Sequence, residues 1–312
     1  MDFWPPSLNP EHSLPSSPPS PRLSMNHSAR HLFSLTAGLL LMVVNPARAE
    51  SQPDPDFHIY LCLGQSNMEG FPGIPNQDRS FQDDRFLTLA AVDFPELGRE
   101  RGHWYPAVPP LCRPNSGVSP ADFFGRTLIQ QLPPETTVGV VSVAVAGAKI
   151  EVFDSANVAA YAATSPEWLQ GFIRAYDGDP YARLVAMARV AQQDGVIKGI
   201  LLHQGESNTG DPTWPAQVNA LYERLLDDLA LAAEGVPLLV GELVHADQNG
   251  ACASMNEIIA TLPELIPTAH VVSSAGAPCH PDRLHFTPEG YRLLGQRYAE
   301  TLLAIPPPKS GR

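Results

Sequence analysis

Lysine is almost absent from this chain of 312 residues, and its basic side chains are scattered. Three of the 20 lysine and arginine residues are lysines (Lys149, Lys198 and Lys309), against 33 aspartate and glutamate residues and a formal net charge of −13. No basic run and no basic stretch interleaved with aromatic residues occurs, which argues against binding to the phosphate backbone of a nucleic acid. The acidity itself indicates little beyond solubility.

Cysteine is scarce too, and the spacing of the four cysteines matches no metal-ligand pattern. Cys62 lies within an apolar run and is expected to be a buried free thiol. Cys252 and Cys279 flank one helix–strand segment, so they are the favoured disulfide pair if the chain is exported, although four cysteines allow three full pairings. Cys112 is expected to be free.

The chain has no apolar run of the roughly 20 residues that span a bilayer as a helix. Its apolar run at 32–44 follows Arg30 and His31 and precedes Ala47-Arg48-Ala49. A basic start, a short apolar centre and small residues before a cleavage site form the layout of a secretory signal peptide. A retained membrane anchor is the alternative interpretation of this run.

The domain organisation follows from these segments. Residues 1–24 are rich in proline and serine and are expected to be a disordered or untranslated leader, with translation beginning at Met25. We expect a signal peptide at 25–49 with cleavage near Ala49, and a single domain at 50–312. The protein is accordingly expected to be secreted or periplasmic, without a membrane association after cleavage.

Apolar runs alternate with helical patterns along the expected mature chain. The runs that indicate strands lie at 57–63, 137–146, 196–203, 237–244 and 270–274. The helical stretches lie at 121–132, 181–193, 214–233, 255–262 and 288–303. This alternation predicts an α/β fold with a parallel, doubly wound sheet of five strands. Residues 80–120 show no regular pattern.

A glycine-flanked turn follows the first of these strands. The apolar run ends at Gly64, and Gln65-Ser66-Asn67-Met68-Glu69-Gly70 come next. Ser66 would therefore stand at the carboxyl end of the strand, where open α/β sheets bind their ligands. A serine that caps the start of a helix is the alternative.

Polar groups also follow two other strands and precede the last helix. The second strand is followed by Gly147. The third strand ends in the motif His203-Gln204-Gly205-Glu206-Ser207-Asn208. The helix expected at 288–303 is preceded by Asp282-Arg283-Leu284-His285. Serine needs a base to become nucleophilic, and histidine suits that task because its ordinary pKa is about 6.5. Asp282 lies close enough in sequence to hold the His285 ring. A structural histidine at a helix start, beside an acidic residue, is the alternative for His285.

Acyl transfer also requires hydrogen-bond donors for the oxyanion of the transition state. The backbone N–H of Ser66, the backbone N–H of Gly147 and the side-chain amide of Asn208 are the candidates. Together with Ser66 and His285, these groups fill every role that an esterase site requires.

The Gly64–Met68, His203–Asn208 and Asp282–His285 motifs, in this order, resemble the sialate O-acetylesterase-type branch of the SGNH (GDSL-like) hydrolases, which includes the acetylxylan esterases of carbohydrate esterase family six. The resemblance runs from about 57 to 303. It implies a three-layer α/β/α sandwich of the flavodoxin-like type with a central, mainly parallel five-stranded sheet.

The resemblance also implies roles for individual residues. It implies Ser66 as the nucleophile, Asp282 and His285 as its partners, and Ser66, Gly147 and Asn208 as oxyanion donors. Four further residues are implied to shape the site: Gln65, Gln204, Gly205 and Glu206. Glu206 orienting His285 is an alternative. The chain departs from the family at Lys149, which either contacts an acidic sugar or points to solvent.

The leading hypothesis is a serine esterase that removes acetyl groups from acetylxylan or a related acetylated carbohydrate, without a metal or organic cofactor. One alternative is a glycan-binding protein without turnover, with Trp104, Tyr105 and Trp214 stacking on sugars. Others are an esterase for lipid or aryl esters, and a metal hydrolase built on Cys279, His280, Asp282 and His285. The glycan, the regioselectivity and the oligomeric state stay open.

Overall fold

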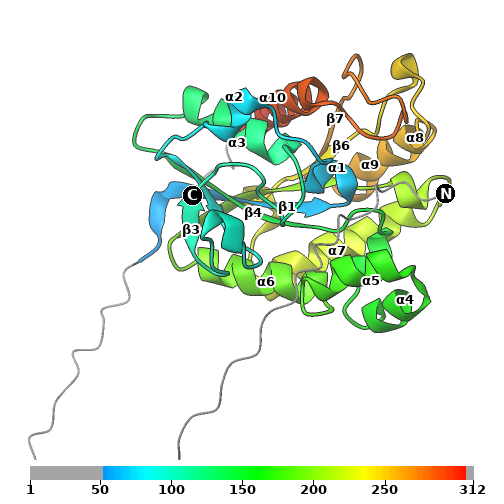
Figure 1. The fold of residues 1–312 in the computed structure, drawn as a ribbon, viewed down its shortest axis with the longest axis horizontal. Coiled ribbons are helices and arrows are strands. Elements are labelled where there is room, and N and C mark those ends of the chain that lie inside the picture. The colour runs from blue at the N-terminus through cyan, green and yellow to red at the C-terminus, as the bar shows by residue number, and fades with distance from the viewer. Residues whose placement is uncertain (1–51, 307–312) are drawn as a thin grey trace, which may run out of the picture. The chain divides into compact units, whose positions relative to one another are not determined.

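The computed structural model describes residues 52–306. The expected leader and signal peptide, 1–24 and 25–49, lie outside these residues. The described part folds around one seven-stranded sheet (Figure 1) with the order β3-β2-β4-β1-β5-β6-β7. The strands are β1 (Asp54–Gly64), β2 (Phe86–Leu89), β3 (Trp104–Pro106), β4 (Thr137–Ala144), β5 (Gly195–His203), β6 (Leu238–Gly241) and β7 (Ala269–Val272).

Six strands run parallel, and only the edge strand β3 is antiparallel to its neighbour β2. The five strands expected from the sequence are β1, β4, β5, β6 and β7, so the mainly parallel α/β sandwich is confirmed. The expected count of five is too low. The two extra strands have four and three residues within the irregular 80–120 region. Pairing with β4, rather than a local pattern, makes β2 a strand.

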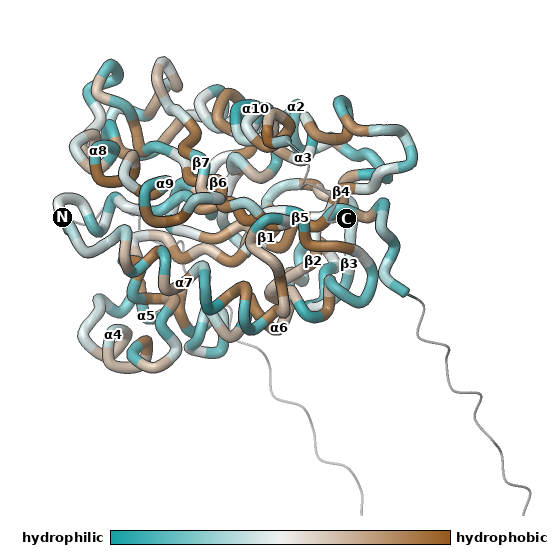
Figure 2. The backbone as a smooth tube through the Cα atoms, turned by 180° about the vertical axis from the view of Figure 1, so that it is seen from behind, coloured by the Kyte–Doolittle hydropathy of each residue, from teal (hydrophilic) through white to brown (hydrophobic). Residues whose placement is uncertain are grey.

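Helices cover both faces of the sheet. On one face pack α3 (Pro120–Gln131) and α10 (Pro288–Ala304), and on the other pack α6 (Pro180–Ala191), α7 (Trp214–Asp228), α8 (Met255–Ile259) and α9 (Leu262–Leu265). Along β1, Ile59 and Leu61 face the α6–α7 layer, whereas Tyr60 and Cys62 face the α3–α10 layer. The strands are therefore apolar on both faces. In Figure 2 the sheet strands include many of the brown, hydrophobic stretches of the tube.

The expected helices are present, with two differences. The helix expected at 214–233 ends at Asp228, and Ala230 then takes a left-handed conformation. The stretch expected at 255–262 ends at Ile259, and α9 then restarts with Pro263 in its first turn. Short elements that the pattern did not indicate are α1 (Ser66–Glu69), α2 (Asn76–Arg79), α4 (Val158–Thr164), α5 (Glu167–Arg174) and five 3₁₀ turns, η1 (Pro95–Leu97), η2 (Ile150–Phe153), η3 (Glu206–Asn208), η4 (Ala233–Gly235) and η5 (Ala246–Gln248).

All four cysteines are free thiols. The expected pair Cys252–Cys279 is therefore wrong: the Cys252 thiol donates to the carbonyl of Glu206, and the Cys279 thiol donates to the carbonyl of Gln248. Cys62 is buried, as expected, and burial raises the pKa of its thiol. No helix between residues 52 and 306 has the length and apolar character needed to cross a bilayer.

Candidate active site

The carboxyl ends of β1, β4 and β5 meet at one edge of the sheet because β1 lies between the other two. Gly64 at the end of β1 is opposite both Ala144 and His203. This close approach requires glycine, since a Cβ on Gly64 would lie 2.1 Å from the carbonyl oxygen of His203, and its φ is +152°. The sheet register thus brings the segments that follow the three strands together.

Ser66, His285 and Asp282 form a series of hydrogen bonds at this edge. The Oγ of Ser66 lies 3.0 Å from Nε2 of His285, and Nδ1 of the same ring lies 2.7 Å from Oδ2 of Asp282. The other carboxylate oxygen of Asp282 accepts from the backbone N–H groups of Leu284 and His285. The three residues singled out from two distant motifs are therefore in contact, in the order that a hydroxyl, a base and an orienting acid require.

The electrostatics of the pair favour a neutral ring beside a charged carboxylate. Burial lowers the pKa of His285 below its ordinary value, against the opposing effect of Asp282. Burial works to raise the pKa of Asp282, but the hydrogen bonds from His285 and the two backbone N–H groups outweigh it and leave that pKa below its ordinary value. His285 is thus able to accept a proton at neutral pH.

Asn67, which the motif analysis left without a role, joins the turn after β1 to the segment that carries His285. Its side-chain nitrogen donates to the carbonyl of Leu284 (2.9 Å) and to Oε1 of Glu206 (2.6 Å). Its side-chain oxygen accepts from the backbone N–H of Phe286 (3.2 Å) and from the hydroxyl of Tyr291 (2.9 Å). Both neighbours of His285 are therefore held by the residue that follows Ser66.

Glu206 does not orient His285 directly, because Asp282 occupies Nδ1 of the ring and Glu206 contacts Asn67 instead. Its second carboxylate oxygen is buried and has no hydrogen-bond partner among residues 52–306. Burial raises the pKa of Glu206 to about 7. Glu206, one of the residues implied to shape the site, thus acts through Asn67.

The other residues implied to shape the site form one buried network. Oε1 of Gln65 accepts from the Gln204 side chain (3.1 Å) and from the backbone N–H groups of Gly205 and Ser207. Gln204 also donates to Oδ1 of Asn208 (2.8 Å) and accepts from the indole N–H of Trp214. These contacts lock the turn after β5 against the turn after β1.

The three proposed oxyanion donors differ in their surroundings. Among the described residues, the backbone N–H groups of Ser66 and Gly147 have no hydrogen-bond acceptor. The Asn208 amide donates to Oε2 of Glu151 (3.1 Å) and, at 3.5 Å, to Oδ2 of Asp211. Both amide hydrogens of Asn208 therefore face carboxylates, whereas the two backbone donors are unengaged.

A buried ion pair supports the turn that carries Gly147, and the sequence analysis missed it. Oε2 of Glu69 accepts from the backbone N–H of Ala146 (2.8 Å), and Oε1 lies 2.6 Å from the Arg113 guanidinium. Burial raises the pKa of Glu69, against the opposing effect of Arg113. A charged residue, Glu69, in the turn directly after an apolar strand was the available sequence signal for this contact, but its partner Arg113 lies in the irregular region.

Aromatic side chains lie beside the site, but not those proposed from the sequence. The Phe71 ring lies 4.5 Å from the His285 ring between centroids, tilted by 31°. Trp214 is fully buried, and Trp104 lies in the edge strand, packed on Phe57 near the opposite end of β1. Tyr105 neighbours Trp104 in β3. Trp104 and Tyr105 therefore lie away from Ser66, and Trp214 is buried beneath the site, where its indole N–H donates to Gln204, so none of the three is placed to stack on a sugar.

Lys149 is exposed near Asp211, an acidic residue of the same edge. Its backbone N–H donates to the hydroxyl of Tyr161 (2.9 Å), and its positive charge contributes to lowering the pKa of Asp211, after hydrogen bonds from Thr213. Lys149, which departs from the family pattern, thus lies at an edge of the sheet that carries both positive and negative side chains.

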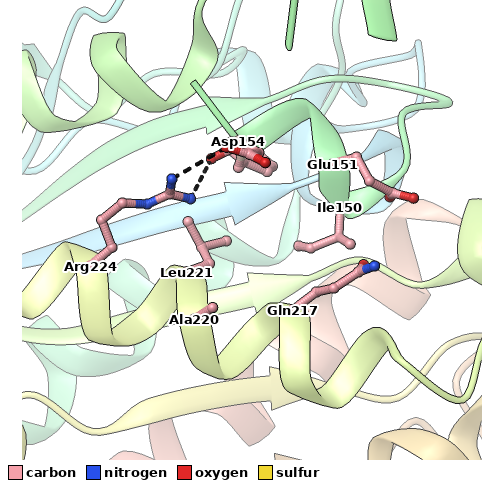
Figure 3. A pocket seen from close by; sticks show the side chains of 8 residues that line it. Ile150, Glu151, Asp154, Gln217, Ala220, Leu221 and Arg224 are labelled. Atoms are coloured by element: carbon pink, nitrogen blue, oxygen red, sulfur yellow. Dashed lines mark hydrogen bonds and ion pairs between the residues drawn. The ribbon is translucent and has the colours of Figure 1, made fainter. Parts of the chain in front are cut away.

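A groove of about 400 Å³ lies between η2 and α7 (Figure 3). Arg224 of α7 pairs with Asp154 across it (3.5 Å) and donates to the carbonyl of Phe153. Gln217 and Ala220 lie along the same side of α7. Glu151, which also lines the groove, accepts from Asn208 and so joins it to the candidate active site. Among the residues between 52 and 306, no group of three or more histidine, cysteine, aspartate or glutamate side chains is arranged to hold a metal ion.

The fold and the site define an SGNH-type hydrolase: an α/β/α sandwich with a serine after the first strand and a histidine–aspartate pair before the last helix. A family model described as carbohydrate esterase, sialic acid-specific acetylesterase matches residues 56–304. The chain belongs to this family and is a carbohydrate esterase of the acetylesterase type.

Solved structures share the fold at low sequence identity. A protein from Arabidopsis thaliana is 22% identical with a TM-score of 0.60, covering 80% of this chain and 99% of that one. NanS is 17% identical with a TM-score of 0.59, covering 80% and 97%. A carbohydrate acetylesterase from Xanthomonas citri is 18% identical with a TM-score of 0.52, covering 77% of this chain and 55% of its own.

Proposed function

We propose that the protein is a serine esterase that removes O-acetyl groups from acetylxylan or a related acetylated glycan through an acetyl-enzyme intermediate. The observation that carries the proposal is the contact series Ser66–His285–Asp282, with 3.0 Å and 2.7 Å between the paired atoms. Family membership supports the acetyl ester, and the geometry supports the serine mechanism. The proposal includes export of the mature chain and requires no cofactor.

In the first half of the reaction, Oγ of Ser66 attacks the acetyl carbonyl carbon while Nε2 of His285 takes the hydroxyl proton. Asp282 stabilises the imidazolium ion that forms. The carbonyl oxygen becomes an oxyanion, which accepts hydrogen bonds from the backbone N–H groups of Ser66 and Gly147. The bond to the sugar oxygen then breaks, and His285 returns the proton to that oxygen.

In the second half, a water molecule attacks the acetyl-enzyme and gives its proton to His285. Acetate leaves as Ser66 regains its proton. Asn208 serves as the third oxyanion donor by turning one N–H from a carboxylate toward the substrate, and the 3.5 Å contact with Asp211 is the weaker one to give up.

The variant Ser66→Ala tests the proposal. We expect its turnover of p-nitrophenyl acetate to fall by at least about a thousandfold, with an unchanged circular dichroism spectrum, because no other group at the site supplies the nucleophile. Ser142→Ala is the matched control, since Ser142 is a buried serine within β4, away from His285. Full activity of Ser66→Ala would refute the serine mechanism.

Acetate release from acetylated xylan, O-acetylated sialic acid and monosaccharide acetates then assigns the glycan. Comparing acetyl with octanoyl esters separates this proposal from an esterase for lipid esters. A glycan-binding protein without turnover would release acetate from none of these compounds.

A further inference from the structure

Trp168 is an exposed tryptophan beside the candidate active site. It belongs to α5 and leaves 40% of its surface exposed. Trp104 packs against Phe57 in the sheet, and Trp214 is fully buried. Burying an indole is favourable, so an indole that stays exposed is available to bind a ligand, and its neighbours indicate which kind.

The indole lies directly against Gly147. A Cβ on Gly147 would be 2.5 Å from Cη2 and 3.0 Å from Cζ3 of Trp168, so only glycine allows the ring to come this close. Gly147 has a left-handed φ of +72° and carries one of the proposed oxyanion donors, its backbone N–H. The ring therefore stands beside the group that would receive the substrate carbonyl.

A chain of contacts holds the indole in place. The Phe172 ring lies 5.7 Å from the Trp168 ring in an edge arrangement, and the Arg113 guanidinium lies 3.7 Å from the Phe172 centroid. Arg113 in turn pairs with Glu69, which accepts from the N–H of Ala146. The same buried charges thus support both the indole and the turn that carries Gly147, so the ring is preorganised.

The surroundings of the ring suit an amphipathic ligand. The polar residues Lys149 and Glu151 follow Gly147 within the same segment. The other large apolar side chains that are exposed in the described part of the chain are Leu97 (η1), Leu265 (α9) and Leu303 (α10), on other elements. The indole, with the partly buried Phe172 ring at its edge and polar residues in the neighbouring segment, matches the apolar face of a sugar ring whose edge is polar.

We propose that Trp168 is the sugar-binding platform of the active site, on which the pyranose ring of the substrate stacks while its acetyl group enters beside Gly147. This inference rests on the proposed function and assigns the carbohydrate part of the substrate to a residue. Trp168 is then a specificity-determining residue, since it contacts the sugar and not the bond that breaks.

The test compares two acetyl esters that share the reacting group. Acetate release is measured from ethyl acetate and from acetylated xylotetraose or O-acetylated sialic acid, whichever the wild type cleaves faster. In Trp168→Ala, the ratio of kcat/KM for the glycan to kcat/KM for ethyl acetate should fall by about tenfold, mainly through KM. Trp168→Phe should restore most of the ratio, and Leu265→Ala, which removes a side chain 47% exposed on α9, should not change it.

Two outcomes would overturn the proposal. An unchanged ratio in Trp168→Ala would mean that the indole does not bind the sugar. An equal fall for both esters would mean that the indole only supports the Gly147 turn.

A binding measurement separates this inference from the proposed function. The non-acetylated glycan, xylotetraose or sialic acid, should quench the tryptophan emission of Ser66→Ala and should not do so in the double variant Ser66→Ala/Trp168→Ala. If the wild type releases no acetate but this quenching is present and depends on Trp168, the proposed function fails and the platform stands. Quenching that persists without Trp168, or that never occurs, refutes the platform.

Discussion

At the scale of single residues, the site depends on Asn67, whose side-chain oxygen and nitrogen are both fully used in hydrogen bonds. Asn67 is fully buried and makes four hydrogen bonds, two of them to the backbone on either side of His285. Serine and histidine alone do not make a nucleophile, because a ring displaced by about 1 Å loses much of its effect. Asn67 is therefore a positioning residue that acts through His285.

Replacing Asn67 by alanine should lower kcat for ethyl acetate by about tenfold or more, with a much smaller change in KM, because the proton acceptor is no longer held beside Ser66. The free energy of unfolding should also fall by about 1–3 kcal/mol, since the groups that Asn67 paired are left unsatisfied.

Asn256→Ala is the control for this experiment. Asn256 is also buried and also pairs with backbone groups, both of them on Leu243. It should lose a similar free energy of unfolding while keeping the wild-type kcat at temperatures well below melting. Equal losses of kcat in the two variants would show that Asn67 contributes stability alone.

At the scale of secondary structure, α3 and α10 approach each other closely where α10 has a glycine. A Cβ on Gly295 would lie 2.5 Å from the carbonyl oxygen of Pro120 and 2.6 Å from Cβ of Phe123. The first of these atoms is a backbone oxygen and the second is the first carbon of a side chain, so neither can move aside by a simple rotamer change. The close contact positions α10, which begins three residues after His285.

Gly295→Ala should therefore lower the free energy of unfolding by about 1–3 kcal/mol and reduce the melting temperature, despite the higher helix propensity of alanine. Gly171→Ala in α5 is the matched control, because its nearest neighbour would be the flexible Arg174 side chain at 3.7 Å. That variant should be as stable as the wild type or up to about 1 kcal/mol more stable. Denaturant titration measures the free energy of unfolding of both variants. A Gly295→Ala variant as stable as the wild type would contradict the tight packing.

At the scale of the whole molecule, buried ionisable groups couple stability to pH. The pKa of Glu206 is about 7 in the folded protein, raised by burial from an ordinary value of 4.5. Between these two pH values the unfolded chain releases the proton and the folded protein keeps it. Glu206 therefore makes the folded state less stable as the pH rises from about 4.5 to about 7.

Glu206→Gln removes the ionisable carboxyl group while keeping a side-chain oxygen that can accept a hydrogen bond from Asn67. Its free energy of unfolding, relative to the wild type, should be higher at pH 8 than at pH 5, by up to about 3 kcal/mol. Denaturant titrations at the two pH values measure the difference. For Gln130→Ala, on the exposed side of α3, the difference from the wild type should be the same at both pH values, because neither side chain ionises. A pH-independent difference for Glu206→Gln would show that its carboxyl group is already ionised at pH 5.

Residue order and residue type along the chain were enough to predict the parallel α/β architecture, the strands β1, β4, β5, β6 and β7, and the contact of Ser66 with His285 and Asp282. Each depends on a local signal: an apolar run, a glycine turn, or an acid three residues before a histidine. The order of strands in a parallel sheet then brings such turns to one edge without further information.

Contacts between distant segments were decided by packing alone. The short strands β2 and β3 lie in a region without a regular apolar pattern. β2 forms because β4 offers a hydrogen-bonding edge, and β3 then pairs with β2. The Asn208 amide faces Glu151, and Trp168 rather than Trp214 stands at Gly147, because the turns after β4 and β5 and helix α5 pack together there. Such contacts join side chains with no relation in sequence, and only the folded chain determines which of them meet.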